Sequence, residues 1–243
     1  MLKHLSLAVA LFAIALAASG CKKRVAVTGA EAKSSEAGRA CPKDVGLIAD
    51  GENDSNQTAT IQNRGGYWYT FVDDAGSTVA PEAGKNGGTF AMSPGGAAGS
   101  QRSAHMSGTI AGSGTIYAGM ALNFVDPKGA YDASKYQGVT FWAKRGPGST
   151  GKVRLKVPDI STDPDGKKCS ECYNDFGLDL ELTGEWTEYT IPFTSMKQLK
   201  GWGSPHPDGI DASKLYGLQW QVNDPGAKFD IWVDEIAFTG CGG

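Results

Sequence analysis

Two consecutive stretches near the C-terminus decide the fold: Gly217-Leu-Gln-Trp-Gln-Val-Asn-Asp224 and Phe229-Asp-Ile-Trp-Val-Asp-Glu-Ile-Ala-Phe238. Apolar and polar side chains alternate in both, and Pro225-Gly226 lies between them. Successive side chains of a β-strand project to opposite faces of the sheet, so this alternation predicts two strands that are each buried on one face. The Pro-Gly pair predicts the turn that joins them.

The same period of two recurs along most of the remaining chain, in runs separated by Gly, Pro and Asp. No long stretch has the period of a helix, and 34 of the 243 residues are glycine. Short alternating runs bounded by turn residues predict an all-β domain, a two-sheet β-sandwich. Residues 73–102 are rich in Gly and Pro and are expected to form a long surface loop. The clearest runs are 139–144, 153–157, 176–182 and 189–193, and weaker ones span 66–72, 103–109 and 117–124.

Length and charge predict one acidic domain at residues 41–243. These 203 residues are enough for a single domain with a sizeable core. They include 17 Lys and Arg against 24 Asp and Glu, a formal charge of −7. A protein that binds a phosphate backbone would carry the opposite sign, so nucleic acid is not an expected partner.

The N-terminus has the pattern of a targeting segment. Residues 1–20 combine a short basic start with an apolar run that is shorter than the roughly 20 residues of a membrane-spanning helix, which predicts a signal peptide. The ending Ala18-Ser-Gly-Cys21 resembles the bacterial lipobox, and this implies that Cys21 becomes the acylated first residue of a lipoprotein. Residues 21–40 then form a flexible tether to the membrane. Lys22 favours the outer membrane, by resemblance to enterobacterial sorting; the alternative is an ordinary secretory signal with an incidental Cys.

The cysteines suggest two disulfides. Five cysteines leave one unpaired in an oxidising compartment, and acylation of Cys21 would account for it. Cys41 precedes the first expected strand and Cys241 follows the last, so in a sandwich with adjacent termini we expect them to pair. Cys169 and Cys172 would then form a local bridge. Zinc is the alternative for a C-x-x-C pair, but the sequence has no second such pair and no His pair to complete four ligands.

Five segments carry a family resemblance through their order and spacing: Ile48-Ala-Asp-Gly-Glu-Asn-Asp54, Gly65-Gly-Tyr-Trp-Tyr-Thr-Phe-Val-Asp-Asp74, Tyr131-Asp-Ala-Ser-Lys-Tyr-Gln-Gly-Val-Thr-Phe-Trp-Ala143, Trp186-Thr-Glu-Tyr-Thr-Ile-Pro-Phe193 and Ile231-Trp-Val-Asp-Glu-Ile236. Together they resemble the family 11 carbohydrate-binding modules, within the galactose-binding-like jelly-roll superfamily. The resemblance covers nearly the whole domain. It implies a jelly roll that binds polysaccharide or another glycan.

The same resemblance implies a structural calcium between the first and last strands, with Asp50 or Glu52 and Asp234 as carboxylate ligands and backbone carbonyls of residues 73–78 as further candidates. The chain departs from the family's Asp-Phe-Glu-Asp, because Ala49 and Gly51 flank Asp50. Asp234 also interrupts an apolar strand, and a buried carboxylate without partners is costly. We therefore expect Asp234 to meet a cation or several hydrogen-bond donors. The alternative is that it faces solvent or pairs with a Lys.

The alternation places several polar side chains on the faces of their strands that point away from the core. Gln219 and Gln221 are two residues apart, so both amides project from one face. Planar amides and a guanidinium suit sugar hydroxyls, which need paired donors and acceptors. Polar side chains are, however, also the default on any strand face that meets solvent. The ligand residues expected on this face are Arg154, Lys156, Asp179, Gln219, Gln221 and Asn223.

Flat aromatic rings are expected to pack on the C–H faces of the sugar. Trp202, which lies between two glycines in a loop, and Trp142 are the selected residues. We expect Trp186 and Trp220 to pack in the core instead. The other aromatic residues considered for this role are Tyr67, Trp68, Tyr69 and Tyr173.

Catalytic motifs are poorly represented. Asp179 and Glu181 share a strand face, and glycoside hydrolysis uses two carboxylates, but such pairs are common on solvated strands. The chain has no Gly-x-Ser-x-Gly elbow and no Arg-x-Glu-x-Arg strand of the kind found in jelly-roll lyases. We therefore predict a glycan-binding lipoprotein of the cell envelope that is not an enzyme. The alternatives are a structural or adhesive envelope protein that contacts a protein partner and, with less support, a polysaccharide lyase or hydrolase.

Overall fold

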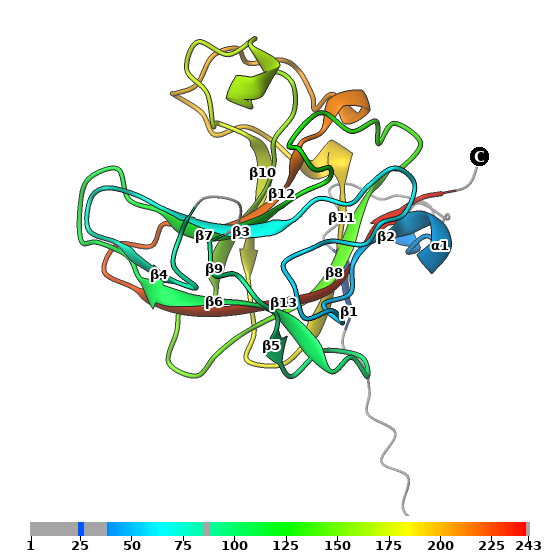
Figure 1. Ribbon diagram of the computed structural model, residues 1–243. Coiled ribbons are helices and arrows are strands. Elements are labelled where there is room, and N and C mark those ends of the chain that lie inside the picture. The colour runs from blue at the N-terminus through cyan, green and yellow to red at the C-terminus, as the bar shows by residue number, and fades with distance from the viewer. Residues whose placement is uncertain (1–23, 27–37, 85–87, 242–243) are drawn as a thin grey trace, which may run out of the picture.

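Two sheets packed face to face form the protein (Figure 1). The computed structural model describes residues 24–26, 38–84 and 88–241, and for residues 24–26 it describes the backbone alone. All strand pairs are antiparallel except that of β1 with β11. The predicted all-β jelly-roll sandwich is confirmed.

The upper sheet in Figure 1 has five strands in the order β10-β9-β12-β7-β3. The lower sheet has eight strands, in the order β1-β11-β8-β13-β6-β4, with β2 also paired to β13 and β5 to β6. The upper strands are β3 (Trp68–Val72), β7 (Ala118–Asn123), β9 (Lys152–Val157), β10 (Phe176–Glu181) and β12 (Gly217–Val222). The lower strands are β1 (Arg24–Ala26), β2 (Leu47–Ala49), β4 (Thr78–Ala80), β5 (Ser93–Pro94), β6 (Arg102–Thr109), β8 (Gly138–Arg145), β11 (Thr187–Pro192) and β13 (Lys228–Thr239). Short helical turns are α1 (Lys43–Gly46), η3 (Pro164–Gly166), η4 (Phe193–Ser195) and η5 (Ala212–Lys214).

Trp220 of β12 joins the two sheets at the centre of the core. Its fully buried ring stacks on Trp68 of β3, with 5.6 Å between centroids, and meets Phe141 of β8 edge-on at 5.4 Å. The predicted apolar phase of the last two strands is therefore confirmed. The buried residues of that phase are Leu218, Trp220, Val222, Phe229, Ile231 and Val233.

Two predictions about packing are wrong. Residues 73–102 are not simply a surface loop, because they form β4 and β5 and bury Phe90, whose ring stacks on Trp68 at 5.5 Å. Trp186 does not join the core, since it lies half-buried with Lys144 Nζ 4.8 Å from its ring centre. Its neighbour Thr187 takes the inward position of β11 instead.

The ends of the domain are tied together as predicted. Cys41 is bonded to Cys241, and Cys169 to Cys172. The first pair closes a loop with a sequence separation of 200, beside the pairing of β2 with β13. Both predicted disulfides are therefore confirmed.

The N-terminal predictions fall mostly outside the described residues. These exclude residues 1–20 and Cys21, so the signal peptide and the acylation stay predictions. Within the expected tether, Arg24–Ala26 forms β1 and pairs with β11. In the part of the chain that is described, no helix is both long and apolar enough to cross a membrane.

The two disulfides should contribute unequally to stability. In the chain-entropy model the stabilisation by a cross-link grows with the logarithm of the number of residues in the loop that it closes. It is about 5 kcal/mol for Cys41–Cys241 and about 2 kcal/mol for Cys169–Cys172. We therefore expect the Cys41→Ser/Cys241→Ser protein to lose more free energy of unfolding in urea than Cys169→Ser/Cys172→Ser. Equal losses would contradict the loop argument.

Candidate functional site

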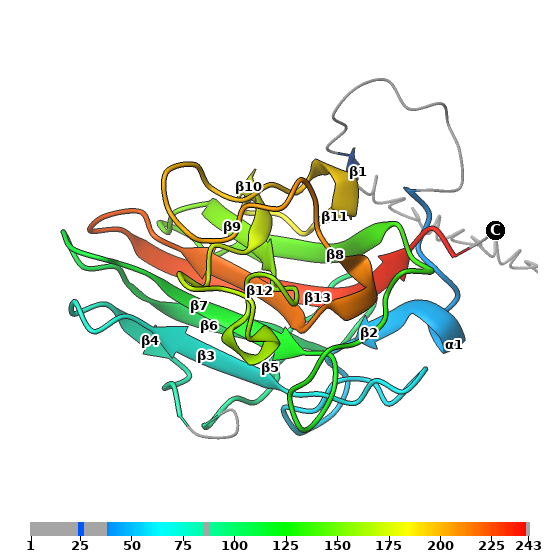
Figure 2. The ribbon, with the colours of Figure 1, turned by 90° about the horizontal axis from the view of Figure 1, so that it is seen from above.

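The outer face of the upper sheet gathers polar and aromatic side chains, and we call it the polar face. Figure 2 views the molecule from above, the side on which this face lies. Strand register arranges its side chains in two rows that run across the strands. The first row is Gly177, Lys156, Gln219, Ala121 and Tyr69, and the second is Asp179, Arg154, Gln221, Gly119 and Phe71.

Two glycines let larger side chains lie flat on the polar face. A methyl group at Gly119 would overlap the ring of Phe71, so this ring lies over the backbone of β7. A methyl group at Gly177 would lie 3.1 Å from Nε of Arg154, so the guanidinium lies over β10. The face therefore carries a flat apolar ring on one side and a flat cation on the other.

Lys156 holds the middle of the polar face in place. Its ammonium donates to Gln221 Oε1 at 3.2 Å and to the carbonyl oxygen of Tyr173 at 3.0 Å. It also lies 3.0 Å from Asp175 Oδ2, a buried ion pair without the geometry of a hydrogen bond. Because Gln221 Oε1 accepts from Lys156, the NH₂ group of this amide is left to donate to a ligand.

Arg154 supports the β10 side of the polar face. It is only 7% exposed and donates to Asp179 Oδ1 at 3.0 Å and to the carbonyl oxygen of Lys197 at 2.6 Å. The side chain of Asp179 is 76% exposed, so one carboxylate edge stays open as an acceptor. Arg154 thus positions Asp179 more than it presents itself to solvent.

Aromatic residues line the β3 side of the polar face. The ring centroids of Tyr67 and Tyr69 lie 6.1 Å apart. Those of Phe71 and Tyr117, which precedes β7, are also 6.1 Å apart. Burial is the main cause that raises the pKa of Tyr69 to about 12; Asp163 and Asp175 of the loop after β9 add to it, and Lys128 opposes them. The end of the face at Tyr69 is therefore covered, whereas Phe71 lies at its open part.

Two long loops, residues 158–175 and 197–211, stand above the upper sheet over β10 and β12, and we call them the loop layer (Figure 1). Asn174 connects them: its side-chain amide donates to the carbonyl oxygens of Leu199 and Trp202, and its Oδ1 accepts from Leu199 N. Among the described residues, the large hydrophobic side chains that stay exposed are Tyr173 at 60%, Trp202 at 39% and Leu199 at 37%. All three lie in the loop layer.

The structure brings most of the predicted ligand residues together. Asn223 lies one residue past the end of β12, exposed and in the same phase as Gln221, and Trp202 lies in the loop layer. Trp142 does not reach the polar face, because it belongs to β8 of the lower sheet, opposite Asp234. The predicted residues on the face itself are Arg154, Lys156, Asp179, Gln219 and Gln221.

Sequence reasoning missed two aromatic residues and misplaced a third. Phe71 and Tyr117 were not predicted, although Phe71 continues the phase of Tyr67 and Tyr69 at intervals of two residues. Trp68, considered as an aromatic surface, is buried in the core at 1% exposure. The alternation along β3 was the signal that could have assigned Trp68 to the core and Phe71 to the outer face.

Two carboxylates of the expected calcium site, those of Glu52 and Asp234, accept hydrogen bonds from one loop, residues 95–102, and the Asp50 carboxylate accepts one from Glu52. Asp234 Oδ2 accepts from Ala97 N and Oδ1 from Glu235 N, both at 2.8 Å. Glu52 Oε1 accepts from Ser100 Oγ and from the backbone N–H groups of residues 101 and 102, which lowers the pKa of Glu52. Asp50 Oδ1 accepts from Glu52 N at 3.3 Å.

Calcium binds six to eight oxygen ligands, and N–H groups aimed at the same carboxylates oppose a cation. Within the described ranges, no three His, Cys, Asp or Glu side chains are arranged to hold a metal ion. Asp50, Glu52 and Asp234 therefore do not fit a shared calcium site. Asp234 was expected to meet either a cation or several hydrogen-bond donors. The structure shows donors, the N–H groups of Ala97 and Glu235.

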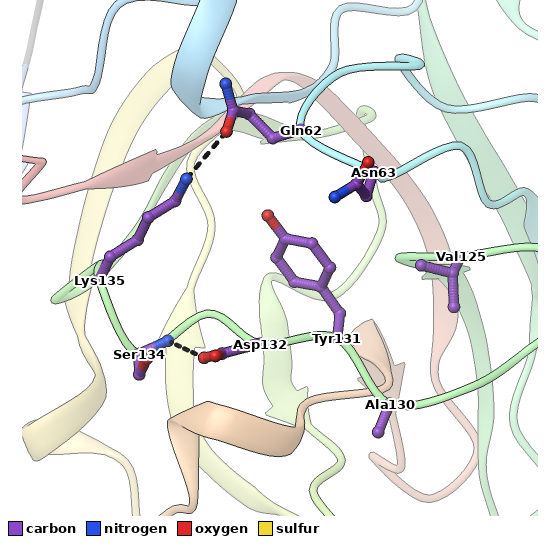
Figure 3. A pocket seen from close by; sticks show the side chains of 8 residues that line it. All are labelled: Gln62, Asn63, Val125, Ala130, Tyr131, Asp132, Ser134 and Lys135. Atoms are coloured by element: carbon purple, nitrogen blue, oxygen red, sulfur yellow. Dashed lines mark hydrogen bonds between the residues drawn. The ribbon is translucent and has the colours of Figure 1, made fainter.

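A pocket with a volume of about 450 Å³ lies away from the polar face, between the loop before β3 and the loop after β7 (Figure 3). Several of its polar groups pair with each other: Lys135 Nζ donates to Gln62 Oε1 and Ser134 N to Asp132 Oδ1, both at 2.9 Å. Tyr131 is 7% exposed and offers no open ring face. The polar face is the stronger candidate, because it combines unpaired amide donors with the partly exposed aromatic ring of Phe71.

The fold is shared with solved carbohydrate-binding modules. A family 11 module from Clostridium thermocellum, in complex with a β-1,3-1,4-mixed-linked tetrasaccharide, is 18% identical, with a TM-score of 0.54 over 81% of this chain and 96% of that one. A family 11 module of a cellulosomal cellulase from the same organism is 16% identical, with a TM-score of 0.53 over 79% and 93%. A family 30 module is 14% identical, with a TM-score of 0.52 over 80% and 97%.

No protein-family model matches the sequence, and no curated protein matches it. At this level of identity the likeness shows the β-sandwich fold. What the face of that fold binds has to be argued from this chain's own residues.

Asp234 should make stability depend on pH in an unusual direction. Burial raises its pKa from 3.8 to about 6, so the folded protein holds the proton more tightly than the unfolded chain. The stabilisation of the folded state that protonated Asp234 provides is fully present below about pH 4. It is lost as the pH rises to about 6, which lowers the free energy of unfolding by about 3 kcal/mol.

We expect the difference in free energy of unfolding between the wild type and Asp234→Asn to shrink by about this amount between pH 4 and pH 7. Urea titrations at several pH values measure this difference. Comparing two proteins at each pH cancels the titration of all other groups. A difference that stays constant with pH would show that folding does not raise the pKa of Asp234.

Proposed function

We propose that this protein binds a glycan chain on the polar face and does not turn it over. The observation that carries the proposal is the convergence of Gln219, Gln221 and the flat ring of Phe71 on one sheet face. The shared fold with carbohydrate-binding modules supports it.

The polar face offers the two kinds of contact that a sugar ring needs. The NH₂ group of Gln221 donates, the open edge of Asp179 accepts, and Gln219 supplies a second amide in the next row. Phe71 provides an apolar surface against which the C–H face of a pyranose can pack. Neutral hydroxyls suit this set, because the charges of Arg154 and Lys156 are already paired with Asp179 and Asp175.

The arrangement does not support hydrolysis. A general acid needs surroundings that keep its proton, such as burial in an apolar pocket. Asp179 is instead exposed and paired with Arg154, and Glu181 is exposed at the end of β10. Binding without catalysis is therefore the function that the polar face supports.

We further propose that the protein is a lipoprotein of the outer membrane, acylated at Cys21. The lipobox-like Ala18-Ser-Gly-Cys21 and Lys22 support this. A calcium cofactor is not part of the proposal, since the carboxylates expected to bind it take N–H donors.

The glycan proposal predicts that Gln219→Ala/Gln221→Ala weakens binding by about tenfold or more, since each lost hydrogen bond is worth about 1 kcal/mol. Affinity electrophoresis of the purified protein in gels with β-1,3-1,4-glucan, galactan or mannan measures this. Gln137→Ala, an exposed amide outside the face, and Trp142→Ala are the controls and should bind like the wild type.

A folded wild-type protein that binds none of these polysaccharides would refute the proposal. Capture of a protein partner that is unaffected by sugar would favour the alternative of an adhesive protein. Release of reducing or unsaturated ends would favour a hydrolase or lyase.

Acylation predicts that Cys21→Ser moves the protein from the membrane fraction to the soluble fraction, because the lipid anchor is lost. Immunoblots of fractionated bacteria and incorporation of labelled palmitate measure this. Cys172→Ser serves as a control that keeps the anchor. An unchanged membrane fraction without label would contradict acylation.

A further inference from the structure

Tyr173 is the most exposed large hydrophobic residue among those described, at 60%, and its backbone is strained. Its φ angle is 73°, in the left-handed region that residues with a Cβ rarely adopt. Such strain persists only where surrounding contacts impose it, and it often marks a functional position. The contacts around Tyr173 identify what imposes it.

Both backbone polar groups of Tyr173 are held. Its N–H donates to the carbonyl oxygen of Thr162 at 2.9 Å, and its own carbonyl oxygen accepts from Lys156 Nζ. The Cys169–Cys172 disulfide precedes it directly, and Asn174, which joins the two loops of the loop layer, follows. Four adjacent interactions therefore fix the chain on either side of one exposed ring.

The bond to Lys156 places this segment above the polar face. The same ammonium that binds the Tyr173 carbonyl oxygen also binds Gln221 Oε1, so Tyr173 crosses the face beside Gln221. Gln221 is paired with Gly119, over which the ring of Phe71 lies, so the Tyr173 backbone and the Phe71 ring both lie next to Gln221. Burial is the main cause that raises the pKa of Tyr117, and Asp74, Asp73 and Tyr173 nearby add to it. Tyr117 in turn lies next to Phe71.

We infer that Tyr173 contacts the ligand from the loop side, opposite Phe71, and that the Cys169–Cys172 disulfide holds it in this position. The inference rests on the proposed glycan binding and narrows it. The ligand unit between the two rings is a neutral pyranose with both ring faces available for packing, as in the interior of an unbranched chain. An acidic sugar is disfavoured, because the cations nearby are already paired.

Replacing Tyr173 by glycine separates a ligand contact from a structural role. Tyr173→Gly removes the ring and relieves the left-handed strain, so the melting temperature should stay the same or rise. Affinity for polysaccharide should fall about tenfold, as expected for the loss of one packed aromatic ring. Tyr173→Phe keeps the ring and should keep the affinity. Leu199→Ala removes another exposed apolar side chain of the loop layer and should bind like the wild type.

The role of the disulfide is tested by a double-mutant cycle on the same gels, with β-1,3-1,4-glucan, galactan and mannan. Cys169→Ser/Cys172→Ser should weaken binding when Tyr173 is present and change nothing further when it is Gly. Additive losses would show that the disulfide does not act through Tyr173.

Two outcomes of these experiments separate the role of Tyr173 from glycan binding as such. Binding that Gln219→Ala/Gln221→Ala abolishes but Tyr173→Gly leaves intact would overturn the inference and keep the proposed function. A wild-type protein that binds no polysaccharide would overturn both.

Discussion

Burial of Trp220 fixes the register of β12, and the composition of the polar face depends on that register. Trp220 stacks on Trp68 within the upper sheet and meets Phe141 of the lower sheet. A shift of β12 by one residue would turn this ring to solvent and two glutamines into the core, which the apolar interior cannot accommodate. The same packing that stabilises the sandwich therefore places Gln219 and Gln221 on the outside, side by side.

The sequence predicted this part well because it depends on local alternation. The strands β9, β10 and β12 were identified from their period, and their residues on the ligand face followed from the opposite phase. The runs that form β3 and β7 were weaker, and Phe71 was missed for this reason. Phase alone does not say to which of two sheets a strand belongs, and Trp142 was misplaced for this reason: it faces outward, but from β8. Trp186 was misplaced because it precedes the start of β11, where Thr187 takes the inward position.

Contacts between loops that are distant in the sequence could not be predicted from the alternation along single strands. The sequence suggested that Asp50, Glu52 and Asp234 meet, and they do approach one loop through the pairing of β2 with β13. Which groups satisfy them depends on the course of residues 95–102, where the N–H groups of Ala97, Gln101 and Arg102 donate to Asp234 and Glu52. That course follows no period, and the same is true of the Lys156 bonds that connect the loop layer to the polar face.

The loop layer covers part of the first row of the polar face, and this limits how a ligand can lie. In this row, Lys156 is bonded to Tyr173 of the loop layer and Tyr69 lies near the loop after β9, whereas Gln219 between them stays partly exposed. In the second row, Asp179 is exposed on β10 and Phe71 lies flat on the opposite edge. A ligand that contacts both ends of this row must cross all five strands, about 19 Å at the usual strand spacing. An extended chain of a few sugar rings has that length, whereas a single monosaccharide reaches only the middle, between Gln221 and Tyr173.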